Sequence, residues 1–278
     1  EAPLVVPPDV LVRSEVVAVT PFGLALVARY GAHVLLAAWM VRARRGLVPD
    51  YTPYVATVPT DLAGHPLFFG ADARHALRGT AFLAVVEARR ARLAEEHAWI
   101  RARVPVFADL DAAEWIAART LVTSRSFACG EGDALAPVAD LLNHAGAPVA
   151  AWTCDPVAGF RLRIARPVPA GAEITQSYGP KSNARLLLGY GFTLRENPHD
   201  DVEIEVGVHG FFRLEAAETA ESRRLVATVG GRAAVAAFCR ERLAGLPPAE
   251  EADGADPGVV SALRVRESER RVLAYWAE

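Results

Sequence analysis

Apolar residues recur along this chain in two spacings, one typical of helices and the other typical of strands. Within residues 73–103, four apolar side chains fall near one helical face: Phe82, Val86, Leu93 and Ile100. This spacing predicts one long amphipathic helix whose apolar stripe is turned toward a core. Arg92 and Glu96 are placed to pair at i,i+4 on the opposite, solvated face of that helix.

Two more helices are predicted by the signals at their ends. Residues 32–45 are apolar at the start and basic at the end, and Gly46 follows them, which is the pattern of a helix C-terminus. Asp111 stands before the next helical stretch, with Glu114 three residues later. We therefore expect the Asp111 carboxylate to cap that helix.

The pattern changes to strands after Ser124. The first twelve residues already read as a short apolar strand broken by two prolines, and alternation of apolar and polar residues predicts three later strands: residues 160–166, 173–178 and 202–208. Residues 182–190 read as a helix, and the C-terminal tail is helical around an acidic loop at 246–258. Helices, then strands, then helices predict an α+β fold without a parallel βαβ sheet.

Composition narrows the classes of partner. The 278 residues are 52% hydrophobic and carry a net charge of −3, which argues against a nucleic-acid binder or a membrane-surface protein. The most apolar run, residues 31–41, is shorter than the roughly 20 residues that cross a bilayer. We expect a monomer. The chain begins at Glu1 rather than Met, so we also expect that a leader or an N-terminal segment has been removed.

The three cysteines, Cys129, Cys154 and Cys239, are far apart and show no CxxC spacing. This pattern argues against a zinc cluster. It favours reduced thiols and an intracellular compartment such as the cytoplasm, the nucleus or the chloroplast stroma.

Three short segments combine polar and aromatic residues: SRSF at 124–127, DLLNHAGAP at 140–148 and YGPKSNARLLLGYGF at 178–192. Each has a structural explanation when taken alone. An Asn-His pair is often a turn, a tyrosine at a strand end packs its ring, and Gly-Pro-Lys-Ser-Asn suits a turn followed by a helix N-cap. Their order and spacing together favour a functional site.

This arrangement resembles the SET-domain family, in the split-SET branch of the Rubisco large-subunit lysine methyltransferases and the related histone-, ribosomal-protein- and actin-modifying enzymes. The Asn-His pair is followed about 35 residues later by Tyr-Gly, then by KSNA and GYGF. The Pro-Ala-Gly-Ala-Glu turn and the upstream PDYTPYVATVP and PLFF segments are also similar to the family's. The resemblance covers residues 1–208, and RVRESERRVL in the tail is similar to part of the family's C-terminal helical domain.

The resemblance implies a β-clip of short strands with a helical insertion, divided into four parts. These are a truncated N-terminal part of the SET domain (1–20), the SET insertion (21–115), the C-terminal SET core with the catalytic motifs (116–208) and a partial substrate-binding helical region (209–278). It implies S-adenosyl-L-methionine (SAM) as cofactor, a protein lysine as methyl acceptor and no metal.

The resemblance also assigns roles to residues. Tyr178 matches the catalytic tyrosine, which also faces the cofactor. Five further positions match the cofactor-binding residues: Arg125, Asp140, Asn143, His144 and Phe192. Four positions match the substrate-binding residues: Ser124, Phe127, Trp152 and Tyr190. The family's N-terminal Gly-x-Gly turn, which holds the cofactor, has no counterpart here, and Glu1 falls just after its place.

Two alternatives stay open. One branch of the family methylates histidine, so the acceptor is either lysine or histidine. The other alternative is a degenerate SET module that binds a protein partner without catalysis. The missing Gly-x-Gly turn favours the degenerate module, whereas the joint presence of Asn143, His144, Tyr178 and Tyr190 opposes it.

Overall fold

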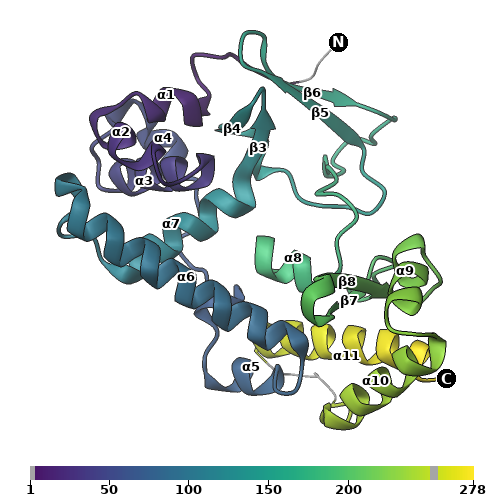
Figure 1. Cartoon of the computed structure of the whole chain (residues 1–278). Helices are drawn as coiled ribbons and strands as arrows, with labels where there is room; N and C mark the ends of the chain where they lie inside the picture. Colours follow the sequence, from purple (N-terminus) through teal and green to yellow (C-terminus); the bar gives the residue numbers. More distant parts are fainter. Residues whose placement is uncertain (1–3, 251–255) are drawn as a thin grey trace. The chain divides into compact units, whose positions relative to one another are not determined.

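The computed structural model describes residues 4–250 and 256–278, and the chain forms two compact units. The first unit comprises Glu1–Thr60 and Arg92–Gly179, and the second comprises Asp61–Ala91 and Pro180–Glu278. Both contain helices and small antiparallel sheets, so the predicted α+β class is confirmed (Figure 1). In the part of the chain that the structure describes, no helix is both long and apolar enough to cross a membrane.

The first unit contains two three-stranded antiparallel sheets. One sheet has the order β1-β6-β5, with the strands β1 (Leu4–Val6), β5 (Ala150–Asp155) and β6 (Gly159–Ile164). The other has the order β2-β4-β3, with the strands β2 (Val12–Arg13), β3 (Ser126–Cys129) and β4 (Gly132–Leu135). The predicted N-terminal strand and the strand over 160–166 are therefore present, the second ending at Ile164.

Helices of the first unit pack beside these sheets. They are α1 (Ser14–Ala18), α2 (Pro21–Val27), α3 (Ala32–Arg44), α4 (Thr52–Val55), α7 (Ala112–Arg125) and the C-terminal part of α6 (Ala81–Arg103). Helix α3 ends before Gly46, whose φ of +74° suits glycine, as the sequence predicted. Asp111 caps α7 by accepting the N–H groups of Ala113 and Glu114 at 2.8 and 3.2 Å, which confirms the predicted cap.

An aromatic cluster and a disulfide join the two sheets of the first unit. Phe127 on β3 meets Trp152 on β5 edge-on at 5.0 Å, and Trp152 stacks on Phe160 at 5.8 Å. Cys129 and Cys154 lie two residues farther along the same strands and form a disulfide with Cα atoms 4.9 Å apart. The expectation of three reduced thiols was wrong, because the chain brings together two cysteines that lie 25 residues apart in sequence.

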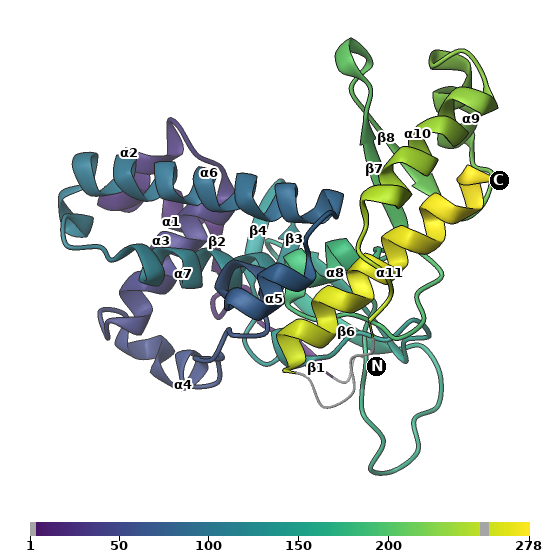
Figure 2. The ribbon, with the colours of Figure 1, turned by 90° about the horizontal axis from the view of Figure 1, so that it is seen from below.

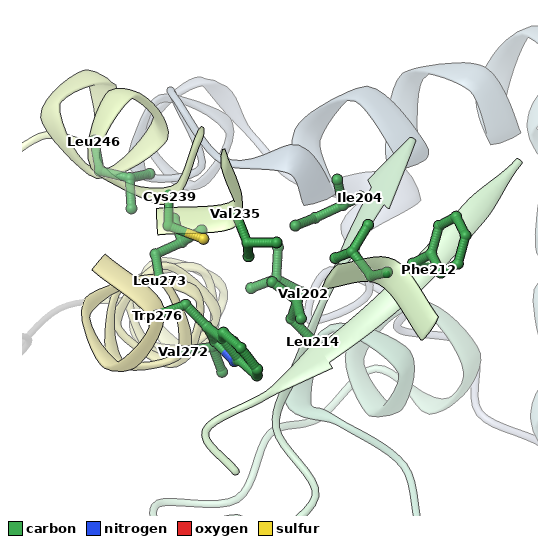
Figure 3. Close-up of a cluster of buried hydrophobic side chains, with 11 residues drawn as sticks. Val202, Ile204, Phe212, Leu214, Val235, Cys239, Leu246, Val272, Leu273 and Trp276 are labelled. Atoms are coloured by element: carbon green, nitrogen blue, oxygen red, sulfur yellow. The ribbon is translucent and has the colours of Figure 1, made fainter. Parts of the chain in front are cut away.

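The second unit is built around a two-stranded hairpin. Its strands are β7 (Asp201–Glu205) and β8 (Phe211–Glu215), and its helices are α5 (Ala71–Ala76), the N-terminal part of α6, α8 (Asn183–Tyr190), α9 (Ala220–Thr228), α10 (Arg232–Gly245) and α11 (Pro257–Ala277). Helix α11 lies against α5 and α10 (Figure 2). Side chains from β7, β8, α10 and α11 point toward one another in the core of this unit, where Trp276 is 1% exposed (Figure 3).

The predicted helix over 73–103 is two helices, α5 and α6. The break falls at Gly79, whose φ is +80° and whose Cα lies so near the Gly245 carbonyl that a Cβ would approach the oxygen to 2.8 Å. A new N-terminus then forms, at which Thr80 accepts the N–H of Leu83 and Glu269 accepts that of Ala81. Tertiary packing at Gly79 therefore overrides the local helical pattern.

Glu96 does not lie on a solvated face. It pairs with Arg92 at 3.5 Å as predicted, but its side chain is only 4% exposed and accepts a hydrogen bond from Arg119 of α7 at 2.9 Å. The predicted apolar stripe of α6 is correct, since its four members are all buried.

Two predicted strands differ in the structure. Residues 173–178 make a single β-bridge, between Gln176 and His144, and form no regular strand. The strand predicted over 202–208 ends at Glu205, because Gly207 and Gly210 adopt positive φ and turn the chain back into β8, which leaves Val208 98% exposed. Residues 182–190 do form a helix, α8, with Ser182 as its N-cap.

Candidate active site

Two segments of the first unit that lie far apart in sequence are joined at the Asn-His pair. The N–H of Gln176 donates to the Asn143 carbonyl at 2.9 Å, and the N–H of Ala145 donates to the Gln176 carbonyl at 2.9 Å. These bonds align residues 143–145 in parallel with Gln176. The structure therefore places the Asn-His motif directly beside the segment that carries the Tyr-Gly motif.

Tyr178 is fixed at both its backbone and its hydroxyl. Its N–H donates to Nδ1 of His144 at 3.0 Å, and its hydroxyl donates to the carbonyl of Leu142 at 2.7 Å. The two rings lie 5.3 Å apart and are tilted by 32°. A hydroxyl that donates its proton to a carbonyl presents its oxygen to other groups as an acceptor. Because Nδ1 accepts, the neutral His144 imidazole carries its proton on Nε2.

Asn143 is exposed, and its amide is oriented by a carboxylate. Nδ2 donates to Oε1 of Glu173 at 2.6 Å. Glu173 follows the Pro169–Gly171 turn, in which the Ala172 N–H bonds the Pro169 carbonyl and Gly171 has a φ of +81°. The turn thus delivers the carboxylate that sets the direction of the Asn143 side chain.

A buried polar triad lies next to the Asn-His turn. Arg125, the last residue of α7, donates to the Asp140 carbonyl at 3.0 Å, and its guanidinium lies 3.4 Å from the Asp140 carboxylate. The hydroxyl of Tyr54 donates to the same carboxylate at 2.7 Å. Burial raises the pKa of Asp140, while Tyr54 and Arg125 act in the opposite direction. Asp140 is thus a buried charge held by two partners, which is the arrangement that such a charge requires.

Sequence reasoning did not identify Tyr54. The feature of the sequence that pointed to Tyr54 is its position in the PDYTPYVATVP segment, which is similar to a segment of the SET family. Its partner Asp140 lies 86 residues away, so the pairing depends on the fold.

The predicted substrate-binding residues of the first unit have different surroundings. Ser124 donates to the Leu121 carbonyl at 3.1 Å within α7. Phe127 is 7% exposed and belongs to the aromatic cluster between the sheets, and Trp152 is half-buried against it. Their substrate-binding roles stay predictions.

Tyr190 and Phe192 belong to the second unit. Tyr190 ends α8, and Gly191 follows it in the left-handed region with a φ of +81°, so that the two rings lie 6.3 Å apart. Burial raises the pKa of Tyr190. His65 supports this end of α8, since its Nε2 lies 2.9 Å from the Leu188 carbonyl and its Nδ1 accepts the N–H of Leu67.

The asparagine of the KSN segment has a structural role in the second unit. Asn183 is 1% exposed and bonds both the N–H and the carbonyl of Leu194, at 2.8 and 3.0 Å. Its N–H donates to Asp200, and its amide donates to Ser268 of α11. Asn183 therefore ties α8 to the following loop and to the C-terminal helix.

Known proteins similar to this chain are SET-domain methyltransferases. The ribosomal lysine N-methyltransferase set10 of Schizosaccharomyces pombe is 38% identical over 77 residues, which are 27% of this chain and 14% of that protein. The actin-histidine N-methyltransferase of Gallus gallus is 25% identical over 188 residues, 60% of this chain and 30% of that protein. The matches thus span less than a third of each relative. No family model matches the chain.

Solved structures of similar fold cover nearly the whole chain. The SET domain of LSMT bound to lysine and AdoHcy superposes with a TM-score of 0.85 at 18% identity, over 99% of this chain and 80% of that one. Rubisco LSMT bound to AdoMet gives a TM-score of 0.85 at 17% identity, over 100% of this chain and 81% of that one. This chain has the SET-domain fold of LSMT, as the sequence motifs predicted.

Proposed function

We propose that this protein transfers a methyl group from SAM to the side-chain amine of a lysine in another protein. The observation that carries the proposal is that Tyr178 is fixed, its hydroxyl by the Leu142 carbonyl and its backbone N–H by His144, in a fold shared with LSMT. Lysine is supported by the name of the set10 relative and by the lysine in the LSMT structure.

The residues around the Asn-His turn fit the amino-acid end of SAM. Oδ1 of Asp140 and Nε of Arg125 are both buried and lack a hydrogen-bond partner among the described residues. A zwitterion with an ammonium and a carboxylate matches such an acceptor and such a donor. Arg125, Asp140 and Asn143 would hold this end of the cofactor, and His144 and Phe192 keep the cofactor-binding roles that the resemblance implies. When bound, SAM supplies a sulfonium methyl group that a neutral amine attacks in line.

The chain's own groups would align and desolvate the amine. A lysine with its usual pKa near 10.4 costs roughly 4.6 kcal/mol to deprotonate at pH 7. A site lined by half-buried aromatic side chains lowers the cost of deprotonating the lysine, because burial disfavours the ammonium form. The Tyr178 oxygen would accept a hydrogen bond from the amine and orient its lone pair toward the methyl carbon. A preorganised acceptor of this kind stabilises the transition state without reorganising during the reaction.

A histidine acceptor is the second candidate. The actin-histidine methyltransferase aligns over 188 residues of this chain, against 77 for the ribosomal lysine enzyme. Histidine is the easier chemical acceptor at neutral pH, because its usual pKa of about 6.5 leaves one ring nitrogen unprotonated. Lysine is preferred here for its higher identity to the set10 relative, 38% against 25%.

The acceptor is identified by labelling. The protein is incubated with cell lysate and methyl-labelled SAM, and the labelled proteins are hydrolysed for amino-acid analysis. The proposal expects labelled methyllysine that depends on Tyr178. Labelled methylhistidine in place of methyllysine would show that the acceptor is histidine, the second candidate. Incorporation no higher than with Tyr178→Phe would contradict methyl transfer and favour a binding module.

A further inference from the structure

The first unit contains a cavity that none of the roles above uses. Its volume is about 570 Å³. Three chain segments line it, at residues 9–10, 50–57 and 137–141. The lining residues are Asp9, Val10, Asp50, Tyr51, Pro53, Tyr54, Thr57, Pro137, Val138 and Leu141. Among the described residues, the lining is aromatic and apolar, apart from Thr57 and two carboxylates, and it includes no lysine, arginine or histidine.

The two tyrosine rings are held rigidly. The hydroxyl of Tyr51 donates to the Val10 carbonyl at 3.3 Å, and its ring meets Trp39 edge-on at 5.2 Å. Tyr54 is fixed by its hydrogen bond to Asp140. Val138 and Leu141 add apolar surface, being 57% and 46% exposed. A preformed wall of this kind suits the aliphatic stem of a long side chain.

The charge of the cavity is negative. Asp9 and Asp50 are both exposed, and the structure gives neither an ion pair with any described residue. Burial is the largest cause that raises the pKa of Tyr51, and the negative charges of Asp9 and Asp50 raise it further. Both carboxylates therefore lie near the Tyr51 ring. Carboxylates repel phosphates and other anions, whereas a cation gains both from them and from an aromatic face.

We propose that this cavity binds the side chain of a lysine or arginine that belongs to the protein substrate and is separate from the methyl-accepting residue. The aliphatic stem would lie on Tyr51, Tyr54 and Leu141, with the cationic end toward Asp9 and Asp50. The identity of the ligand as a protein substrate rests on the proposed methyl transfer. The cavity then selects substrates with a basic residue at a fixed distance from the target.

The cavity adjoins the candidate active site through covalent neighbours. Tyr54 lines the cavity, and its hydroxyl bonds Asp140. Leu141 lines it as well, and the next residue, Leu142, accepts the hydroxyl of Tyr178. A side chain bound in the cavity therefore contacts the same short turn that holds the candidate catalytic tyrosine.

The test is a titration followed by amide chemical shifts. The probes are the Nα-acetyl methylamides of arginine and lysine, with that of norleucine as the uncharged analogue of similar length. We expect both cationic probes to shift the amides of Tyr51, Thr57, Val138 and Leu141. The norleucine probe should bind at least fivefold more weakly than either of them. The double variant Asp9→Asn/Asp50→Asn should weaken the cationic probes at least fivefold, and Glu131→Gln, an exposed carboxylate of the same unit, should not.

Three results would overturn the proposal. Equal binding of norleucine and arginine would show that charge is not recognised, and unchanged binding by the double variant would show that Asp9 and Asp50 are not involved. Shifts of the same four amides by AdoHcy would make the cavity part of the cofactor site. If the wild-type protein transfers no methyl group, the proposed function fails on its own, because the titration needs no catalysis.

Discussion

The backbone N–H of Tyr178 donates to Nδ1 of His144 across 34 residues of sequence, at 3.0 Å. Together with the Gln176 bridge, this bond holds the Tyr-Gly segment against the Asn-His turn. The imidazole of His144 thereby has a structural role, in addition to the cofactor-binding role that the resemblance assigns to this residue.

Two replacements of His144 distinguish the contribution of its hydrogen-bond acceptor from that of its ring. Asparagine places an oxygen near the position of Nδ1, whereas leucine has no acceptor. We expect His144→Leu to lower the free energy of unfolding by about 1 kcal/mol more than His144→Asn, the usual net value of one hydrogen bond. Methyl transfer should fall further in the leucine variant. Equal stability and rate in the two variants, by urea unfolding and initial-rate assays, would show that the bond does not position Tyr178.

The second unit should lose stability in mild acid through His65. Burial lowers the pKa of His65 to about 4, from the ordinary value of about 6.5. The unfolded chain binds the proton more readily, so the stabilisation is complete above pH 6.5 and is lost as the pH falls toward 4. The full loss is roughly 3 kcal/mol.

Urea unfolding between pH 4 and 8 measures this dependence. His65→Gln keeps a donor for the Leu188 carbonyl but does not titrate in this range, so its stability should depend on pH less steeply. His75→Gln removes an exposed histidine and should follow the wild type. Parallel curves for the wild type and His65→Gln would refute the assignment.

Even the substitution of Asn183 by aspartate, a side chain of nearly the same size, should destabilise the protein. The carboxylate cannot donate to the Leu194 carbonyl, and it would add a second negative charge 3.5 Å from Asp200. We expect Asn183→Asp to cost about 3 kcal/mol at pH 7, because a buried network loses a donor and gains an unpaired charge. The cost should shrink toward pH 4 as one carboxylate is protonated. A thermal unfolding series that shows the same cost at both pH values would contradict this reason.

Reduction of the disulfide should weaken the first unit. A crosslink between residues 25 apart lowers the conformational entropy of the unfolded chain, which stabilises the folded state by about 3 kcal/mol. We expect dithiothreitol to lower the thermal midpoint of the wild type. The variant Cys129→Ser/Cys154→Ser should start lower and not respond, while Cys239→Ser should keep the response. A wild-type midpoint that ignores the reductant, after thiol titration has confirmed reduction, is the contrary outcome.

Features with local causes could be predicted from the sequence. The cap at Asp111, the end of α3 before Gly46 and the start of α8 after Ser182 depend on residues within one helical turn, and all three are present. The order and spacing of the motifs favoured one functional site, and the structure joins the Asn-His and Tyr-Gly segments through Gln176.

Features that depend on distant partners could not be predicted in this way. Glu96 is buried because Arg119 reaches it from another helix, and Tyr54 gains its role from Asp140, 86 residues away. The helix break at Gly79 depends on the carbonyl of Gly245. In each case the deciding contact joins segments whose local patterns do not indicate each other.

The measurement that tests methyl transfer most directly is the initial rate with Tyr178→Phe. Phenylalanine keeps the ring beside His144 and the backbone bond, and removes only the hydroxyl that bonds the Leu142 carbonyl. Loss of one preorganised group of this kind costs about 2.7–4 kcal/mol in the transition state, or 10²–10³ in rate. Tyr275→Phe, in the C-terminal helix, is the matched control.

We predict that Tyr178→Phe lowers the rate of methyl transfer at least a hundredfold. Its unfolding free energy should fall by no more than about 1 kcal/mol, the usual net value of one hydrogen bond, its affinity for SAM should stay near the wild-type value, and Tyr275→Phe should keep the wild-type rate. A Tyr178→Phe rate within threefold of the wild type would contradict the catalytic role of Tyr178.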